Sequence, residues 1–69
     1  MPFAHAKLRA LRENAGESRE QVAVAVGRSY SGIVLFETGK RVPTAEVIER
    51  LAIHYGVPID ALFTDRVVF

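Results

Sequence analysis

The sequence contains no cysteine, which excludes both a disulfide framework and a zinc site built on thiolates. It also lacks an apolar run long enough for a secretory signal or a membrane span, so we expect a soluble, cytoplasmic protein with no membrane partner. His5 and His54 stand far apart, and neither has a second ligand at helical spacing. We therefore expect no metal site.

Signals of catalysis are missing as well. The chain shows no nucleophile paired with a base and no glycine-rich loop that would cradle a phosphate. Its 69 residues are too few to enclose a sizeable pocket in addition to a core. We therefore expect no enzyme activity and no cofactor.

The chain does have enough apolar material for one small core. Hydrophobic residues make up 49% of the sequence, and a chain of this length buries only about 60% of its unfolded surface. Small chains without disulfides or metals are usually helical bundles or oligomers. No linker or repeat divides the sequence, so we expect a single domain over residues 1–69, with its core in 4–63 and an apolar tail at 64–69.

Charge is unevenly distributed along the chain, although the formal net charge is only +1. Residues 1–43 hold an excess of basic side chains, and residues 44–69 hold an excess of acidic ones. This asymmetry suits a first half that faces a polyanion. A chance imbalance on a solvated surface is the alternative.

Residues 18–39 carry the main structural signal, which is two short helices joined by a tight turn. Ser18 and Gln21 have the spacing of a helix-capping box, and Gly27 stands where a helix end adopts a left-handed conformation. Ser29 offers a second N-cap. Apolar residues recur at helical spacing behind both caps: Val22, Ala23, Val26, Ile33 and Phe36.

Further helices flank this pair. Gly39 ends the second helix of the pair, and Pro43 keeps the following loop extended. Pro58 suits the first turn of a last short helix. The predicted helices are 2–15, 18–26, 29–38, a helix between Thr44 and Gly56, and 59–63. Five short helices without a credible strand predict an all-α domain.

A set of residues spread over positions 8–63 forms a specific combined pattern. Its members are Leu8, Leu11, Arg12, Gly16, Ser18, Glu20, Val22, Ala23, Val26, Gly27, Ser29, Ser31, Ile33, Glu37, Gly39, Lys40, Arg41, Pro43, Leu51, Ala52, Gly56, Val57, Ile59, Ala61, Leu62 and Phe63. With this pattern the chain resembles the Cro/CI-type (xenobiotic-response-element-like) helix-turn-helix family, which includes repressor domains of phages and many bacterial regulators. The resemblance implies a five-helix, lambda-repressor-like DNA-binding domain whose third helix enters the major groove.

The resemblance also implies roles for individual residues. Base edges would be read by Ser29, Tyr30, Ser31, Val34 and Leu35. Phosphates would be contacted by Ser18, Arg19, Arg28, Thr38, Lys40 and Arg41, with help from the free N–H groups at the start of the second helix. Arg12 and Glu37 match a pair that forms an internal salt bridge in relatives, so Arg12 is expected to be structural.

The third helix departs from the family pattern at several positions. Gly32 stands inside it, where glycine costs about 1 kcal/mol relative to alanine. Val34 and Leu35 replace residues that are typically polar, and they either contact thymine methyls, serve a protein partner or belong to the core. Tyr30 either contacts DNA or caps the core as a half-buried aromatic side chain.

Other positions leave alternatives open. Arg19 replaces the usual glutamine, although it still suits a phosphate contact, and Glu17 replaces a residue that is usually apolar. Arg28, Lys40 and Arg41 flank the third helix, where their alternative role is simply to solvate the loops.

We expect a sequence-specific double-stranded DNA-binding transcription regulator, acting as a repressor. It would form a homodimer whose two recognition helices lie about 34 Å apart. The expected dimer surface is Leu62, Phe63, Val67, Val68 and Phe69, and the alternative is that these residues only close the core.

A second hypothesis is a protein-interaction module, a co-regulator or anti-repressor, that uses the apolar face of the third helix. A third is that the chain is the DNA-binding part of a longer regulator.

Overall fold

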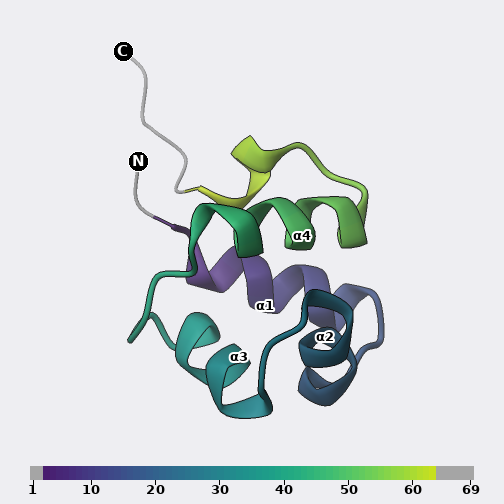
Figure 1. The fold of residues 1–69 in the computed structure, drawn as a ribbon. Coiled ribbons are helices and arrows are strands. Elements are labelled where there is room, and N and C mark those ends of the chain that lie inside the picture. The colour runs from purple at the N-terminus through teal and green to yellow at the C-terminus, as the bar shows by residue number, and fades with distance from the viewer. Residues whose placement is uncertain (1–2, 64–69) are drawn as a thin grey trace.

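The computed structural model describes residues 3–63, which form a bundle of helices (Figure 1). The α-helices of this part are α1 (His5–Asn14), α2 (Arg19–Val26), α3 (Tyr30–Glu37) and α4 (Ala45–Tyr55), and a 3₁₀ turn, η1, covers Ile59–Leu62. None of the helices in the described range has the length and apolar character needed to cross a membrane. The predicted all-α fold class is confirmed.

The N-caps predicted for α2 and α3 are present, and α4 has an N-cap of the same kind. Ser18 accepts a hydrogen bond from the backbone N–H of Gln21, and the side-chain oxygen of Gln21 accepts one from the backbone N–H of Ser18. Ser29 caps α3 and Thr44 caps α4 through their side-chain oxygens. Each cap satisfies a backbone donor that the first helical turn leaves unpaired. These three boundaries therefore follow from local sequence.

The start of α1 is set by a tertiary contact. The helix begins at His5, later than predicted, and Ala4 at its N-cap forms no side-chain hydrogen bond. Phe3 instead forms an isolated antiparallel bridge with Phe63, and the N–H of Ala4 donates to the carbonyl oxygen of Leu62 at 2.9 Å. The two ends of the described chain are thereby joined.

The core receives one face of each helix. The buried apolar side chains are Phe3, Leu8, Val22, Ala23, Val26, Ile33, Phe36, Val47, Ile48, Leu51, Ala52 and Leu62. The predicted apolar stripes therefore face inward, and their burial is the main favourable contribution to folding.

The last short helix, predicted at 59–63, is present as the 3₁₀ turn η1. It ends at Leu62, and Phe63 after it is extended. Because η1 packs against both α1 and α4, the side chain of Leu62 is fully buried. Leu62 therefore closes the core of its own chain, and its predicted place on a dimer surface is wrong.

Gly27 permits the turn between α2 and α3. Its φ is 70°, in the left-handed region, and a Cβ placed there would lie 3.2 Å from Nη1 of Arg50. We expect Gly27→Ala to lower the free energy of unfolding by about 1–2 kcal/mol, as measured by urea denaturation. Gly16→Ala is the matched control for backbone strain, because its φ is 68° and its Cβ would have open space. A smaller loss at Gly27 than at Gly16 would contradict the prediction.

Candidate nucleic-acid interface

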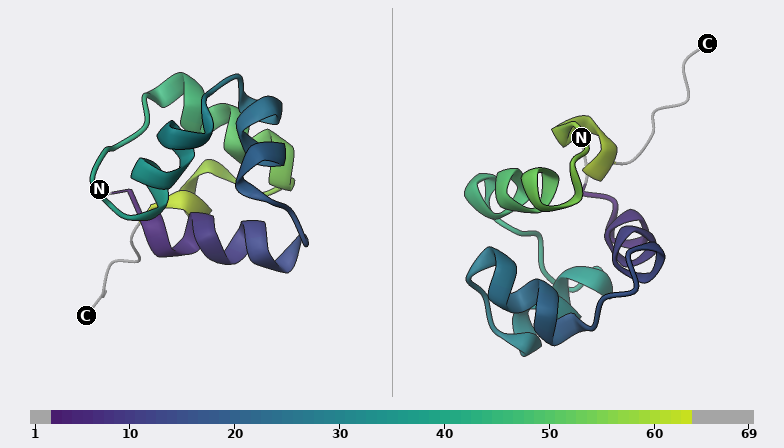
Figure 2. Two further views of the ribbon diagram at one scale, coloured as in Figure 1. Left: turned by 90° about the horizontal axis from the view of Figure 1, so that it is seen from below. Right: turned by 90° about the vertical axis from the view of Figure 1, so that its right-hand side faces the viewer.

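The helix-turn-helix unit of α2 and α3 occupies one side of the molecule. Figures 1 and 2 show these two helices together on the side opposite η1. The turn between them is closed by the N–H of Arg28, which donates to the carbonyl oxygen of Ala23 at 2.8 Å, as in a Schellman motif. Ser18 and Ser29, which precede the two helices, are both exposed. The N-terminal ends of α2 and α3 are therefore open to solvent.

The residues predicted to read bases divide into two groups. Ser29, Tyr30 and Ser31, at the start of α3, are exposed, and Tyr30 keeps 47% of its surface accessible. Val34 and Leu35, one turn further along, are only partly exposed. The polar start of α3 is therefore more accessible than the turn that follows it. Val34 and Leu35 are neither buried in the core nor fully exposed.

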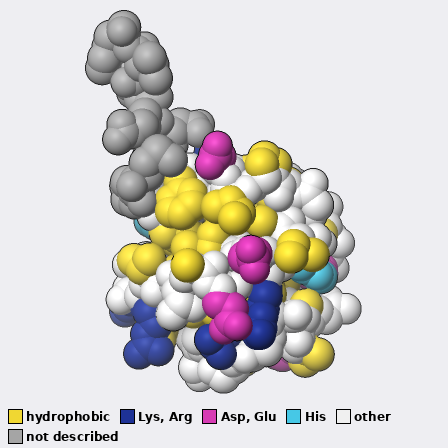
Figure 3. All heavy atoms as spheres, turned by 45° about the horizontal axis from the view of Figure 1, so that its top comes forward, with side chains coloured by type: hydrophobic (Ala, Val, Ile, Leu, Met, Phe, Trp, Pro, Cys, Tyr) yellow, Lys and Arg dark blue, Asp and Glu magenta, His cyan; other side chains and the backbone are white. Residues whose placement is uncertain are grey.

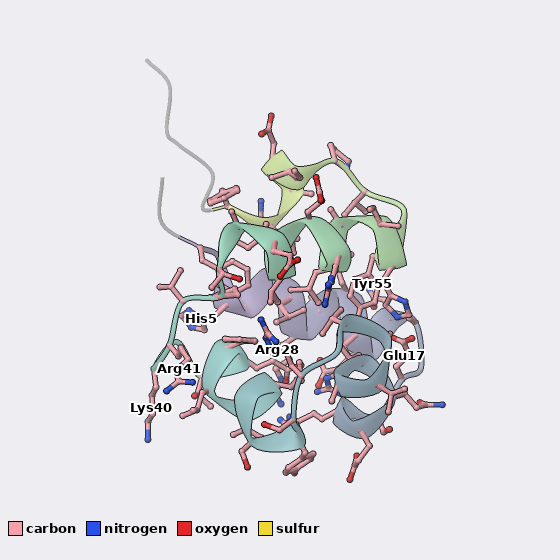
Figure 4. The ribbon with its side chains drawn as sticks, in the orientation of Figure 1. His5, Glu17, Arg28, Lys40, Arg41 and Tyr55 are labelled. Atoms are coloured by element: carbon pink, nitrogen blue, oxygen red, sulfur yellow. The ribbon has the colours of Figure 1, made fainter. Side chains whose placement is uncertain are left out.

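Most of the predicted phosphate contacts are exposed side chains around the same unit: Ser18, Arg28, Thr38, Lys40 and Arg41. In Figure 4, Lys40 and Arg41 extend outward from the loop that follows α3, and Arg28 lies at the turn between α2 and α3. The hydroxyl of Thr38 donates to the carbonyl oxygen of Val34 at 2.8 Å. Within the described residues, neither Lys40 nor Arg41 has an ion-pair partner.

Arg19, the remaining predicted phosphate contact, is bound by a carboxylate of the protein itself. Its Nε donates to Oε1 of Glu37 at 3.1 Å. The same carboxylate accepts two hydrogen bonds from Arg12, one from Nε to Oε2 at 2.6 Å and one from Nη2 to Oε1 at 3.2 Å. We call these three residues the arginine–glutamate cluster.

The arginine–glutamate cluster connects α1, the first residue of α2 and the last residue of α3. Side-chain exposure is 10% for Arg12, 1% for Glu37 and 33% for Arg19. The hydrogen bond to Glu37 is the main reason that the pKa of Arg12 is raised. Since an unpaired buried charge is costly, the buried carboxylate needs Arg12, the more buried of its two partners. The expected pairing of Arg12 with Glu37 is present, but no sequence signal indicated the third member.

A second polar cluster, of Glu17, His54 and Tyr55, was missed by sequence reasoning. Oε2 of Glu17 lies 2.6 Å from Nε2 of His54. Burial raises the pKa of the Tyr55 hydroxyl, and the carboxylate of Glu17 raises it further. Figure 4 places Glu17 and Tyr55 near the C-terminal end of α4. The contact with His54 joins the segment between α1 and α2 to α4, whereas Oε1 of Glu17 and the hydroxyl of Tyr55 are buried without a hydrogen-bond partner among the described residues.

Gly32 lies inside α3 with room for a methyl group. A Cβ there would meet Oγ of Ser29 at 3.4 Å, an ordinary contact. We expect Gly32→Ala to raise the free energy of unfolding by about 0.5–1 kcal/mol, because glycine loses more backbone entropy in a helix than alanine does. Urea denaturation measures the change, and a loss of stability would show that the added methyl group is not tolerated.

Comparison with known proteins decides the family. The profile of the helix-turn-helix domain family matches residues 6–63. The chain belongs to the Cro/CI-type helix-turn-helix family. This helix-turn-helix protein is similar to the cryptic phage CTXphi transcriptional repressor RstR of Vibrio cholerae, with 37% identity over 59 residues. The match covers 86% of the chain and 53% of RstR, so the chain spans about half the length of that relative.

Solved structures show the same helix-turn-helix fold. The restriction-modification controller protein C.AhdI from Aeromonas hydrophila matches with a TM-score of 0.80 and 30% identity, over 86% of the chain and 89% of C.AhdI. A transcriptional regulator from Listeria innocua matches with a TM-score of 0.84 over 100% of the chain and 66% of its own. At 22% identity, the second match supports the fold alone.

Proposed function

We propose that this helix-turn-helix protein is a sequence-specific DNA-binding transcription regulator that inserts α3 into the major groove. The observation that carries the proposal is the exposed polar start of α3, together with the exposed start of α2 in the same helix-turn-helix unit. In a helix-turn-helix, the N-terminal residues of the second helix contact base edges, while the first helix crosses the DNA backbone. Ser29, Tyr30 and Ser31 then read bases, and Ser18 and Arg19 contact phosphate.

The relatives support a regulatory role. RstR is a transcriptional repressor, and C.AhdI is a controller protein. Repression of transcription in the cytoplasm is therefore the mode of action that we propose for this chain. The reaction it performs is reversible binding, without catalysis.

We also propose that the protein binds DNA as a homodimer. One domain of this size covers less DNA than specific recognition usually requires. Figure 3 shows hydrophobic side chains gathered on the face formed by α4 and η1, and Phe63 is only partly buried next to it. Val67, Val68 and Phe69, which were also predicted at the dimer surface, lie outside the described residues. Sedimentation equilibrium showing a monomer at high protein concentration would contradict a dimer.

Selection from random duplexes tests the DNA-binding proposal. We expect an enriched palindromic site and a binding constant whose logarithm falls linearly with the logarithm of salt concentration. Lys40→Ala is expected to weaken binding to all sequences alike and to reduce the salt slope by about one, whereas Tyr30→Ala is expected to change base preference. The proposal fails if no site is enriched and salt has no effect.

The same measurements distinguish a protein-interaction module from a DNA-binding regulator. A regulator is retained on heparin or DNA columns and is released by salt. A co-regulator or anti-repressor would pass through these columns, and substitutions at Val34 or Leu35 would abolish capture of its protein partner. That combination of results would replace the proposed function.

A further inference from the structure

We propose that Glu37 is a positioning residue, which fixes the guanidinium of Arg19 at the start of α2 so that its terminal amino groups face a DNA phosphate. This inference rests on the proposed DNA-binding function. Glu37 itself would not touch DNA. It would hold Arg19 in the orientation in which Arg19 contacts the phosphate.

The hydrogen bonds leave the outer end of Arg19 available. Among the described residues, Arg19 donates only through Nε, to Oε1 of Glu37 at 3.1 Å. The remaining donors of the planar guanidinium are on Nη1 and Nη2, and none of the hydrogen bonds or ion pairs among the described residues uses them. One edge of the group is thus tied to the protein, and the other can donate to a phosphate oxygen.

The three side chains of the arginine–glutamate cluster differ in exposure, and Arg19 is the most exposed of them. Glu37 is 1% exposed and Arg12 is 10% exposed, whereas Arg19 is 33% exposed. Arg12 is fully engaged, since its Nη1 also donates to the carbonyl oxygen of Glu17 at 2.9 Å. Arg19 is therefore the one member of the cluster that is placed to reach a ligand outside the protein.

The charges of the cluster explain why two arginines share one carboxylate. A single Glu37–Arg19 pair would be neutral and would offer little attraction to a phosphate. Arg12 balances the charge of Glu37 from inside the protein, at 2.6 Å. The three side chains together keep one net positive charge, and its exposed part lies on Arg19.

Fixing the arginine in advance favours binding. A free arginine side chain carries about 2 kcal/mol of rotamer entropy, part of which a mobile side chain loses on contacting a phosphate. The hydrogen bond to Glu37 restricts the rotamers of Arg19 in the free protein. Less entropy is therefore lost when Arg19 contacts DNA, which is preorganisation. Arg19 also begins α2, where exposed backbone N–H groups attract an anion. Lysine cannot replace it, because lysine has no separate Nε–H that would hold the group to Glu37.

The substitution Arg19→Lys tests the proposal without changing a buried group. Binding is measured by fluorescence anisotropy on a short mixed-sequence duplex at low salt, where phosphate contacts dominate. We expect Arg19→Ala to weaken binding about tenfold and to reduce the salt slope by about one. We expect Arg19→Lys to weaken binding nearly as much, although it keeps the positive charge.

Arg9→Lys is the matched control, because Arg9 also donates from Nε to a glutamate, Glu13, at 3.1 Å but lies on α1 outside the interface.

A double-mutant cycle with Glu37→Gln separates positioning from a general structural role. Glutamine keeps the shape of the side chain, and thermal unfolding is measured for each variant so that only variants folded at the assay temperature enter the cycle. If Glu37 acts through Arg19, Glu37→Gln weakens DNA binding several-fold in the wild-type background and has no effect in the Arg19→Ala background. Equal effects in both backgrounds would overturn the inference.

Two other outcomes would also decide the matter. If Arg19→Lys binds DNA with the affinity and salt slope of the wild-type protein, a positive charge at position 19 is sufficient for the phosphate contact. The positioning role of Glu37 would then be wrong, while the proposed DNA-binding function would stand. No binding of the wild-type protein to any duplex would overturn the proposed function and the inference together.

Discussion

Replacing Glu37 with alanine is expected to lower the free energy of unfolding by about 3–5 kcal/mol. The carboxylate is buried and binds Arg12 at 2.6 Å and Arg19 at 3.1 Å. Its removal leaves the buried guanidinium of Arg12 with only the half-exposed carboxylate of Glu13, at 4.0 Å, as a counter-charge. Small domains have a total stability of only about 5 kcal/mol, so this variant is expected to unfold at very low urea concentrations. Circular dichroism during urea denaturation measures the loss.

Glu13→Ala is the matched control for Glu37→Ala. Glu13 accepts a hydrogen bond from Arg9 at 3.1 Å and lies 4.0 Å from Nη2 of Arg12, but the Glu13 side chain is 53% exposed. We expect its removal to cost less than about 0.5 kcal/mol, because water replaces it as the partner of Arg9 and Glu37 still neutralises Arg12. Similar losses in the two variants would contradict the argument that burial makes the arginine–glutamate cluster important.

Leu62→Ala is expected to lower the free energy of unfolding by about 2–5 kcal/mol. The side chain is fully buried by the packing of η1 against α1 and α4, so truncation leaves a cavity in the centre of the domain. Since Leu62 faces its own core, we expect sedimentation equilibrium to show an unchanged association state under conditions where the variant is folded.

Ile59→Ala is the control within the same turn. Ile59 is 42% exposed, so its truncation is expected to cost less than about 1 kcal/mol. A shift of Leu62→Ala from dimer to monomer with unchanged stability would mean that Leu62 serves an interface after all. Equal losses at the two positions would show that η1 does not direct Leu62 into the core.

In the proposed arrangement, the arginine–glutamate cluster links the stability of the fold to DNA binding. Glu37 is needed by the fold, because it neutralises Arg12, and in the proposed arrangement it also orients Arg19. Substitutions at Glu37 therefore disturb both properties, whereas substitutions at Arg19 leave the buried ion pair with Arg12 intact. Variants of Arg19 are the ones that report on DNA binding alone.

The exposed surface of α3 is less apolar than its sequence suggests. Val34 and Leu35 are partly covered by protein, so only part of this apolar pair is open to a partner. The exposed residues Ser29, Tyr30 and Ser31 carry hydroxyl groups, which can donate to or accept from base edges. The structure therefore moves the candidate base contacts toward the first turn of the helix.

The sequence by itself determined the features that depend on near neighbours. Ser18, Ser29 and Thr44 begin helices because a side-chain oxygen can reach a backbone N–H three residues on. Gly27 ends α2 because glycine adopts a positive φ without steric cost. Helical spacing of apolar residues identified the core-facing sides, and the combined pattern identified the helix-turn-helix family.

The family resemblance gave the pairing of Arg12 with Glu37, but only the tertiary structure decided which other distant groups meet. Arg19 lies 18 positions from Glu37, and helical periodicity carries no information about such a pair, because the packing of α2 against α3 sets its distance. The same holds for Glu17 with His54, and for Leu62, whose burial depends on where η1 packs. Local propensity acts over a few residues, whereas charge pairing and burial depend on the relative placement of whole helices.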